Sequence, residues 1–563
     1  MKLKVRIKEQ IRVYAACTLL GWLTAGCSKE KAVVKEPVLP VRINTATING
    51  RPLTNALQNI GPQPEIRLSF SRELNPATLN AITMANGNGA NVALTAGLET
   101  GDTTVVIRPS AGLAYLEKYT LTVSTGLKAV SGEELAGRSS WAFATGIDSI
   151  RKFPVISENA LMDTVQRRTL QYFLDFAHPS SGMIREGSKH PSEIVTTGGT
   201  GFGIMALLVG IERGFITKAA GLQQTNKIVT FLKNTAQTFH GAYPHWLNGA
   251  TGAVIPFGAN DNGADLVETA FLVQGLICAR QYFNGSGMDE INLRSDISAI
   301  IDKVEWNWFR QNNQQVLYWH WSSDKGWAMN LKIQGWNECL ISYVLAAGSK
   351  SYAIPKTAYD EGWAKNGEIK NGKTFYSYIL PLGADYGGPL FFAHYSFLGL
   401  NPNGLSDLYA NYLTQNKNHA LINYAYCKAN PGNYYGYSDS VWGLTASNIK
   451  GGYAAGSPAN DQGFIAPTAA LSSFPYTPKE SMAALQFYYY VLGDKIWKQY
   501  GFVDAFSLDV LKNNGAWFDD AFLAIDQGPI VVMMENYRTG LLWRLFMSAP
   551  EVQNGLQKLG FTF

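Results

Sequence analysis

Three carboxylates precede a strongly apolar run in the middle of the chain. Asp261, Asp265 and Glu268 lead into residues 269–283, which contain few polar side chains. If a helix extends back to Asp261, spacings of four and three residues place all three acids within one narrow arc of its surface. Burying unused acids costs free energy, so such a group predicts general acid and base chemistry. The alternative is that Asp261 and Asp265 only cap the helix, whereas Glu268 lies a turn too deep for capping.

The same pattern returns twice. Glu338 precedes the apolar residues 339–347, and Asp526 precedes residues 531–547. If the inner helices of a toroid begin on one side, their acids line a single cavity, and the five carboxylates would converge there. Chance is the alternative, because a chain with 43 acidic residues will begin some helices with them. Glu535 and Arg538, one turn apart, are also explained by an ion pair.

Aromatic residues are concentrated in the loops between these segments. Residues 317–336, residues 434–442 and Trp517 supply flat faces with polar edges, which suit the C–H faces and hydroxyl rims of sugars. The alternative is that the 14 tryptophans only fill a large core. The chain has no phosphate loop, nucleophile elbow or dinucleotide fingerprint. Carboxylates among aromatic loops therefore indicate glycoside hydrolysis.

Helical periodicity runs through most of the chain after residue 158. It predicts helices at residues 161–176, 203–211, 219–239, 265–283, 291–309, 336–347, 481–491 and 531–547. Some of these segments are apolar on all sides and others are amphipathic, as the inner and outer layers of an (α/α)6 toroid require. Two or three stacked helical domains would also fit. The chain is therefore predicted to be mainly α, with residues 158–563 forming the catalytic domain.

Residues 41–147 have a different sequence pattern, in which short runs of alternating apolar and polar residues are broken by Gly, Asn and Pro turns. This predicts a small antiparallel β-sandwich. The order of residues 70–79, 119–124 and 141–144 resembles the bacterial Ig-like modules of cell-surface proteins. Such modules are usually spacers, and we expect no chemistry in this one.

The first 27 residues predict export. A basic start is followed by an apolar stretch too short to span a bilayer and by Leu23-Thr24-Ala25-Gly26-Cys27. This end resembles a bacterial lipobox, with Thr24 where Leu is usual. The resemblance implies a lipidated Cys27, a tether over residues 28–40, and attachment to the outer membrane on its periplasmic or cell-surface face. The alternative is an ordinary cleaved signal peptide.

Composition limits partners and cofactors. A net charge of +4 on 563 residues, without a basic stripe, argues against nucleic acid, and we expect a monomer. Cys278, Cys339 and Cys427 lie in apolar or aromatic stretches and are predicted to be buried thiols. No Cys or His cluster has zinc spacing. The first three acids could hold Ca²⁺, but their spacing matches no calcium loop, so we expect neither metal nor cofactor.

Several motifs together resemble glycoside hydrolase family 144, the bacterial endo-β-1,2-glucanases often called glucoamylase-like. They occur in family order at residues 168–179 (RTLQYFLDFAHP), 196–203 (TTGGTGFG), 265–270 (DLVETA), 335–338 (GWNE), 442–447 (WGLTAS), 526–530 (DQGPI) and 535–538 (ENYR). The resemblance implies an (α/α)6 fold and hydrolysis of β-1,2-glucan with inversion. After the GGPLF motif at residues 387–391, residues 397–402 depart from the family pattern, which affects the expected subsites.

The resemblance also implies roles for particular residues. The family's acidic set falls on the five carboxylates above. We expect Glu338 to be the general acid, because the mouth of an apolar helix raises the pKa of a carboxyl group. Asp261, Asp265, Glu268 and Asp526 would hold or activate water and bind sugar hydroxyls. The side chains expected to bind substrate are Trp336, Trp442, Tyr437, Trp321, His394, Tyr395, Glu535 and Arg538.

Three other functions remain open. The first is an exo-acting β-gluco-oligosaccharide hydrolase, and the second is a surface glycan-binding protein without activity, which would not need five converging carboxylates. A polysaccharide lyase is the third, and it would use Tyr or His as base. The histidines that keep this reading open are His178, His240, His245, His320 and His394.

Overall fold

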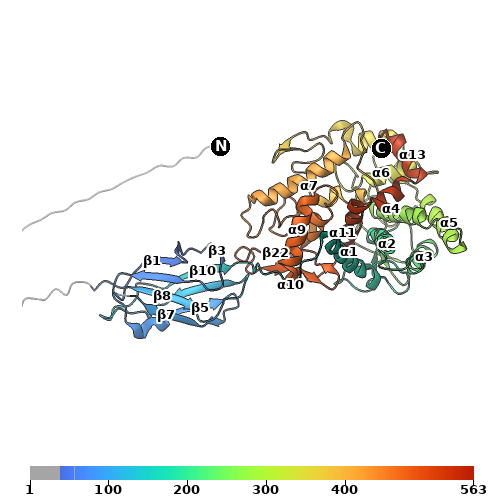
Figure 1. Ribbon diagram of the computed structural model, residues 1–563. Coiled ribbons are helices and arrows are strands. Elements are labelled where there is room, and N and C mark those ends of the chain that lie inside the picture. Colours follow the sequence, from blue (N-terminus) through green and yellow to red (C-terminus); the bar gives the residue numbers. More distant parts are fainter. Residues whose placement is uncertain (1–37, 56, 100) are drawn as a thin grey trace, which may run out of the picture.

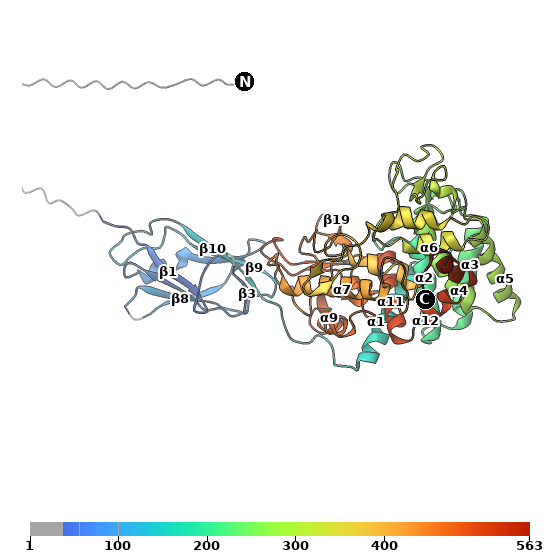
Figure 2. The same ribbon diagram turned by 90° about the horizontal axis from the view of Figure 1, so that it is seen from above.

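The computed structural model describes residues 38–563 except 56 and 100. The predicted signal peptide with Cys27 and most of the predicted tether lie outside the described residues. Figures 1 and 2 show strands gathered at one end of the molecule and helices at the other. None of the described helices is both long and apolar enough to cross a membrane.

The strand-rich end is a β-sandwich, as predicted, but it is not antiparallel throughout, because residues 57–60 pair parallel with residues 139–145. One sheet has the order β2-β1-β4-β8-β7 and the other β3-β10-β9-β5-β6. The strands are β1 (Ile43–Ile48), β2 (Arg51–Pro52), β3 (Leu57–Ile60), β4 (Ile66–Phe70), β5 (Ile82–Asn86), β6 (Asn91–Val92), β7 (Leu94–Leu98), β8 (Thr104–Pro109), β9 (Lys118–Val123) and β10 (Ser139–Thr145). Alternate residues along β4 and β9 are buried, so each strand contributes one face to the core between the sheets.

A few polar contacts join the sandwich to the helical domain. Asn59 Oδ1 accepts a hydrogen bond of 3.0 Å from the Tyr435 hydroxyl group, which in turn accepts one of 3.2 Å from the backbone N–H of Ile147. Gln58 Nε2 donates to Asp509 Oδ1 at 3.2 Å. The junction also contains apolar contacts, because Leu116 and Ile147 pack against the core of the helical domain, but each domain has its own hydrophobic core.

The helical domain alternates between helices buried on most sides and helices buried on one face. The first kind comprises α2 (Thr197–Glu212), α4 (Leu266–Tyr282), α6 (Leu340–Gly348), α8 (Pro467–Leu471) and α11 (Ala524–Arg538). The second kind comprises α1 (Glu158–Asp175), α3 (Lys218–Asn234), α5 (Met288–Asp302), α7 (Tyr412–Ala429), α9 (Pro478–Tyr490) and α13 (Pro550–Leu559). For example, α2 buries 14 of its 16 residues and α5 only 3 of 15, which places α2 in the inner layer and α5 in the outer one.

Glycines bring the inner helices α2 and α4 close together. A Cβ atom at Gly201 would lie 2.2 Å from the Phe271 carbonyl oxygen, and one at Gly275 would lie 2.2 Å from the Gly201 carbonyl oxygen. No larger residue fits at either position. Sequence periodicity predicts a helix only from residue 203, but α2 begins at Thr197 and includes the Gly-rich motif. Close packing outweighs the low helix propensity of glycine here.

Other helix predictions were partly wrong. The predicted segment 531–547 is two helices, α11 and α12 (Leu541–Met547), because Gly540 adopts a positive φ of 70° between them. The segment 291–309 is helical only to Asp302. The 18-residue helix α7 was not predicted, since its sequence mixes polar and aromatic residues without a clear apolar stripe. Cys278, Cys339 and Cys427 are buried free thiols, as predicted.

Candidate active site

A cavity of about 430 Å³ opens where the inner helices α2, α4, α6 and α11 begin. Its wall contains Glu268 and Glu338, and the aromatic residues Trp246, Phe257, Phe271, Trp319, Phe391, Tyr395 and Tyr453. A second hollow shares His245, Phe257, Glu268 and Trp319 with it and continues to Asp261, Asp265 and His320. Acids from the starts of α4 and α6 and from the loop before α4 therefore gather at one end of the helical domain.

Asp265 caps α4 and also holds two histidines. Its Oδ1 accepts hydrogen bonds from the backbone N–H groups of Val267 and Glu268, at 3.0 and 2.9 Å. Its Oδ2 lies 3.4 Å from His245 Nδ1 and 3.4 Å from His320 Nε2. These contacts outweigh burial and hold the pKa of Asp265 well below its ordinary value. Asp265 is therefore a fixed anion and a poor base.

Asp261 does not lie on the helix, which corrects the geometry predicted from spacing. The helix α4 begins at Leu266, and Asp261 lies in the loop before it, in a bridge with Gly258. Asp261 still joins Asp265, because His320 Nε2 lies 3.3 Å from Asp261 Oδ2. Burial lowers the pKa of His320, but the two aspartates outweigh it and raise that pKa to about 9. His320 is therefore a cation that neutralises part of this cluster.

Glu268 is the acid of this group that faces the cavity. Its Oε2 accepts a hydrogen bond of 2.6 Å from the backbone N–H of Gly198, at the start of α2. Burial and the nearby charges of Asp265 and Glu186 raise the pKa of Glu268, although His245 opposes them. Glu268 is thus a stronger base than an ordinary glutamate.

Glu338 lies in the turn before α6, as predicted, and is 8% exposed. Its carbonyl oxygen accepts a hydrogen bond from the Ser396 hydroxyl group, whose oxygen accepts one of 3.0 Å from Ile341 N–H. This anchors the turn. Burial, with smaller contributions from Asp265 and Glu268, raises the pKa of Glu338 to about 7. A carboxyl group with this pKa holds a transferable proton near neutral pH.

Asp526 lies in the first turn of α11 and is only 1% exposed. Its neighbours include Tyr395, a residue of the cavity wall, and the acids Asp504 and Glu186. Burial and these neighbouring acids raise the pKa of Asp526 well above its ordinary value.

One trio in the described chain could hold a metal ion. Ligand atoms of His245, Asp261 and Asp265 lie within 4.8 Å of one another. The same atoms are already used in contacts between histidines and carboxylates, and Asp265 also caps α4. The charges of the trio are thus largely compensated by the protein itself.

Known protein families match both parts of the chain. Residues 330–550 match the family described as "Putative glucoamylase", and residues 47–145 match the bacterial Ig-like domain. The endo-β-1,2-glucanase of Chitinophaga pinensis, solved with sophorotriose and glucose, is 52% identical, with a TM-score of 0.70, covering 73% of this chain and 99% of that one. The chain belongs to the putative glucoamylase family.

Two further proteins similar to this chain come from Parabacteroides distasonis. Its β-1,2-glucanase structure is 37% identical with a TM-score of 0.70, and the match covers 92% of this chain and 73% of that one. Its exo β-1,2-glucooligosaccharide sophorohydrolase (non-reducing end) is 45% identical over 432 residues, 73% of this chain. The match spans only 59% of the length of that enzyme.

Most of the side chains predicted to bind substrate are elsewhere. Of the eight, Tyr395 lines the cavity. Trp442 is fully buried and donates its indole N–H to the Glu480 carbonyl oxygen, and His394 is buried against Ser473. The other aromatic side chains contact protein. Trp336 packs against Phe397 and Tyr412, and Trp321 packs against Phe239, His240 and Trp308. The Tyr437 hydroxyl group donates a hydrogen bond to Asp461. None of these five side chains lines the cavity.

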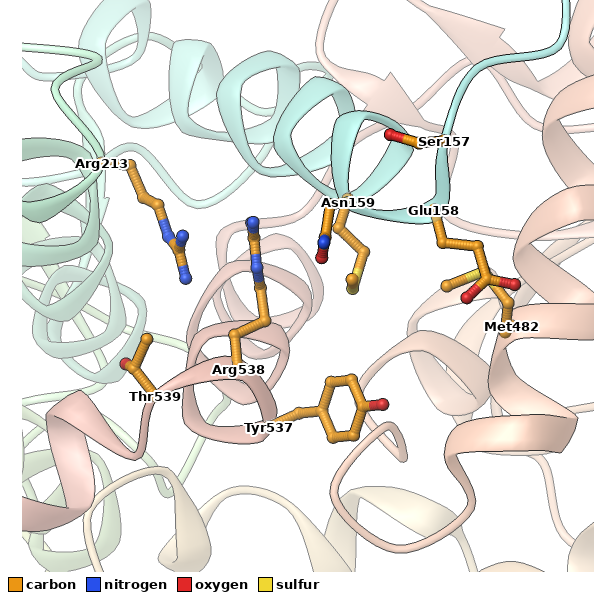
Figure 3. Close-up of a pocket in the computed structure, with 9 residues that line it drawn as sticks. Ser157, Glu158, Asn159, Arg213, Met482, Tyr537, Arg538 and Thr539 are labelled. Atoms are coloured by element: carbon orange, nitrogen blue, oxygen red, sulfur yellow. The ribbon is translucent and has the colours of Figure 1, made fainter.

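Glu535 and Arg538 do not line the cavity either. They lie at the far end of α11 from Asp526. At a rise of about 1.5 Å per residue, this places them roughly 15 Å from Asp526. Glu535 is fully buried and pairs with Arg213 at 2.7 Å, while Arg538 pairs with Asp163 at 2.6 Å. The ion pair between the two that sequence spacing suggested is therefore absent from the described contacts. Figure 3 shows Arg213 and Arg538 around a separate pocket at this end.

Several residues of the cavity wall are not predicted from the sequence. They are Glu186, His190, Trp246, Phe257, Asn448 and Tyr453, with Asp504 behind them. Glu186 and His190 lie in the loop before α2, and Tyr453 lies in the hairpin of β18 (Ala446–Ile449) and β19 (Gly452–Ala455). None of them begins an apolar helix, which was the signal used to find the acids.

Proposed function

We propose that this chain hydrolyses β-1,2-linked glucan as an endo-acting glycoside hydrolase. The observation that carries the proposal is the buried Glu338, which shares an aromatic-walled cavity with Glu268. The 52% identity across nearly all of the Chitinophaga pinensis endo-β-1,2-glucanase supports the substrate and the mode of action. The aromatic walls suit pyranose rings, and the carboxylates supply the acid and base of hydrolysis.

The reaction assigns one role to each side of the cavity. Glu338 donates its proton to the glycosidic oxygen as the bond from that oxygen to the anomeric carbon breaks. A water molecule attacks the anomeric carbon from the opposite face and loses a proton to a carboxylate. Asp265 is too weak a base for this step, and Asp261 is engaged by His320. Glu268 in the wall and Asp526 behind Tyr395 are left to accept the proton.

This arrangement supports inversion of configuration. Glu338 begins α6, whereas Glu268 and Asp526 belong to the starts of α4 and α11, so they face Glu338 from other helices. An inverting pair stands roughly 6.5–9.5 Å apart to admit a water, and a retaining pair roughly 5 Å. We expect the first product to have the α-anomeric configuration, seen by proton NMR before mutarotation. A first-formed β-anomer would show that one carboxylate is a nucleophile.

The test of the activity is a panel of soluble glucans. Purified protein should release sophoro-oligosaccharides of several lengths from β-1,2-glucan and leave β-1,3-, β-1,4- and α-1,4-glucans intact. The second candidate is an exo-acting sophorohydrolase, favoured by the 45% identity to the Parabacteroides distasonis enzyme. That enzyme class would release sophorose alone from the first minutes. If none of the glucans is hydrolysed, the endo-acting and exo-acting functions are both rejected, and a glycan-binding function remains.

Two further features of the chain are also proposals. The alternating inner and outer helices support an (α/α)6 toroid, with the short helical turns Leu390–Ala393 and Ser396–Leu398 in the place of one inner helix. The first 27 residues support export as a monomeric lipoprotein anchored through Cys27 in the outer membrane. Expressed in a bacterial host, a Cys27→Ser variant should move from the membrane fraction to the soluble one. An unchanged distribution would reject the anchor.

A further inference from the structure

A hollow of about 490 Å³ extends the cavity beyond Glu268. Glu338 lines only the cavity, and the walls of both spaces include His245, Phe257, Glu268 and Trp319. Each volume is within the range of roughly 300–1,000 Å³ that is usual for small-molecule sites. A chain of sugars that is cut near Glu338 therefore has room to continue past Glu268 into the hollow.

Two loops supply apolar side chains to the walls of the hollow. Phe257 comes from the loop before α4, and Met329 and Leu331 come from the loop after β15 (His320–Trp321). These residues are 50%, 37% and 44% exposed. A single exposed apolar residue needs no explanation, but three around one hollow beside the candidate active site indicate a binding surface.

Side-chain hydrogen bonds join the two loops. Asn262 Nδ2 donates to Asp324 Oδ1 at 3.0 Å, and Asn262 Oδ1 accepts a hydrogen bond of 2.6 Å from the Ser322 hydroxyl group. Lys325 Nζ donates to the Ala259 carbonyl oxygen. The walls of the hollow are thus held relative to each other before any ligand binds, which lowers the entropy cost of binding.

The Phe257 ring is fixed by two other rings. It stacks on His245, with 4.0 Å between the ring centroids, and it meets Trp246 in a T-shaped contact with 4.8 Å between the centroids. Half of the residue nevertheless stays exposed. A fixed, flat and partly exposed apolar surface suits the C–H face of a pyranose ring.

The charged groups of the hollow compensate each other in pairs. His320 Nε2 lies 3.3 Å from Asp261 Oδ2, and His245 Nδ1 lies 3.4 Å from Asp265 Oδ2. All four residues line the hollow. Paired charges beside apolar walls favour an uncharged sugar over a uronate, and their remaining polar atoms suit its hydroxyl groups.

We propose that the hollow is a distal subsite that binds a glucose unit of the cleaved glucan chain, with the Phe257 ring as its stacking surface. The inference rests on the proposed function, because the bound chain is the one that Glu338 and Glu268 cleave. Contacts far from the cleaved bond supply binding free energy that a shorter chain cannot supply. The subsite therefore favours long chains, as an endo-acting enzyme requires.

The first test measures kcat/KM on β-1,2-gluco-oligosaccharides of increasing length. In the wild-type protein, kcat/KM should rise at the length at which a sugar first reaches the hollow. Phe257→Ala should reduce this rise by about 3- to 10-fold, because the sugar loses an apolar contact, and should leave the shortest cleaved oligosaccharide unchanged. Leu331→Ala, on the other loop, should act in the same way by less. The control is Leu408→Ala, because Leu408 is 74% exposed and lines neither space, and it should change nothing.

Dependence on chain length distinguishes a subsite from a structural role. If Phe257 only supports His245, Phe257→Ala should lower kcat/KM equally at every length. That result together with an unchanged Leu331→Ala would overturn the proposal, and so would wild-type values in both variants. If Phe257→Ala does not fold, the length dependence of Leu331→Ala and Met329→Ala decides.

A second measurement requires no turnover. In a Glu338→Gln background, calorimetry should show that the affinity for β-1,2-gluco-oligosaccharides increases with their length and that Phe257→Ala reduces this increase. An equal increase with and without Phe257→Ala would overturn the subsite, even if the wild-type protein is active. Length-dependent binding that Phe257→Ala weakens, in a protein that hydrolyses no β-1,2-glucan, would support the subsite and reject only the proposed function.

Discussion

The Glu268 carboxylate accepts a hydrogen bond of 2.6 Å from the backbone N–H of Gly198. The bond joins the start of α4 to the start of α2, and it fixes an acid of the cavity wall with a backbone group. A Cβ atom at residue 198 would lie 2.6 Å from Glu268 Oε2 and 3.1 Å from the Phe271 ring. Gly198 is therefore needed for the position of Glu268.

Replacing Gly198 with Ala should displace Glu268. Displacements of about 1 Å can cost about 100-fold in rate, so we expect kcat to fall by at least 10-fold while the protein still folds. Steady-state kinetics and circular dichroism measure the two effects. Gly97→Ala is the control, because no atom lies within 4 Å of its added Cβ. A Gly198→Ala enzyme with wild-type kcat would show that Glu268 needs no such support.

Glu338→Gln removes the transferable proton but keeps the shape of the side chain. Losing a general acid typically costs about 10²–10⁴-fold in rate, with much less effect on ground-state binding. We expect kcat to collapse while the affinity for sophoro-oligosaccharides, measured by calorimetry, changes little. A near-normal rate would show that another carboxyl group is the general acid.

The same substitution should stabilise the protein at neutral and alkaline pH. The pKa of Glu338 is raised to about 7 in the native state, so native Glu338 keeps its proton between about 4.5 and 7, where the unfolded chain has lost it. Its contribution to stability therefore falls as pH rises through that range. Gln cannot ionise, so the gain in Tm over wild type should be larger at pH 8 than at pH 5. An equal gain at both pH values would contradict the raised pKa.

Chelation should leave activity unchanged. The carboxylates of Asp261 and Asp265 are already paired with His245 and His320, so the cluster does not need a cation to be stable. Rates measured before and after dialysis against EDTA should agree. Loss of activity that only added calcium restores would show instead that the trio of His245, Asp261 and Asp265 holds a metal ion.

Removing the Ig-like module should preserve the active site. The module contacts the helical domain through a few hydrogen bonds, each worth about 0.5–1.5 kcal/mol, and contributes no residue to the cavity wall. A chain starting at Asp148 keeps the contact of Lys152 with Tyr490. We expect it to fold with a slightly lower Tm and unchanged kcat on soluble glucan. A folded but inactive chain would show that the module completes the site.

Local signals in the sequence determined the two domains, most inner helices and the acids at their starts. Apolar residues on all sides of residues 266–282 cannot face water, so burial of α4 follows from composition alone. An acid directly before such a helix is buried with it, which is why Asp265, Glu268, Glu338 and Asp526 could be named in advance. The alternating β pattern gave the sandwich for the same reason, since each strand must bury one face.

Only the tertiary structure decided which side chains meet. Aromatic residues look alike in sequence whether they fill the core, as Trp442 does, or line the cavity, as Trp246 does. Glu186, Tyr453 and Asp504 lie in loops whose paths depend on packing against distant helices. The meeting of His320 with Asp261 and Asp265 is a long-range contact. No local pattern encodes such contacts, because the free energy that makes them comes from the packing of the whole inner layer.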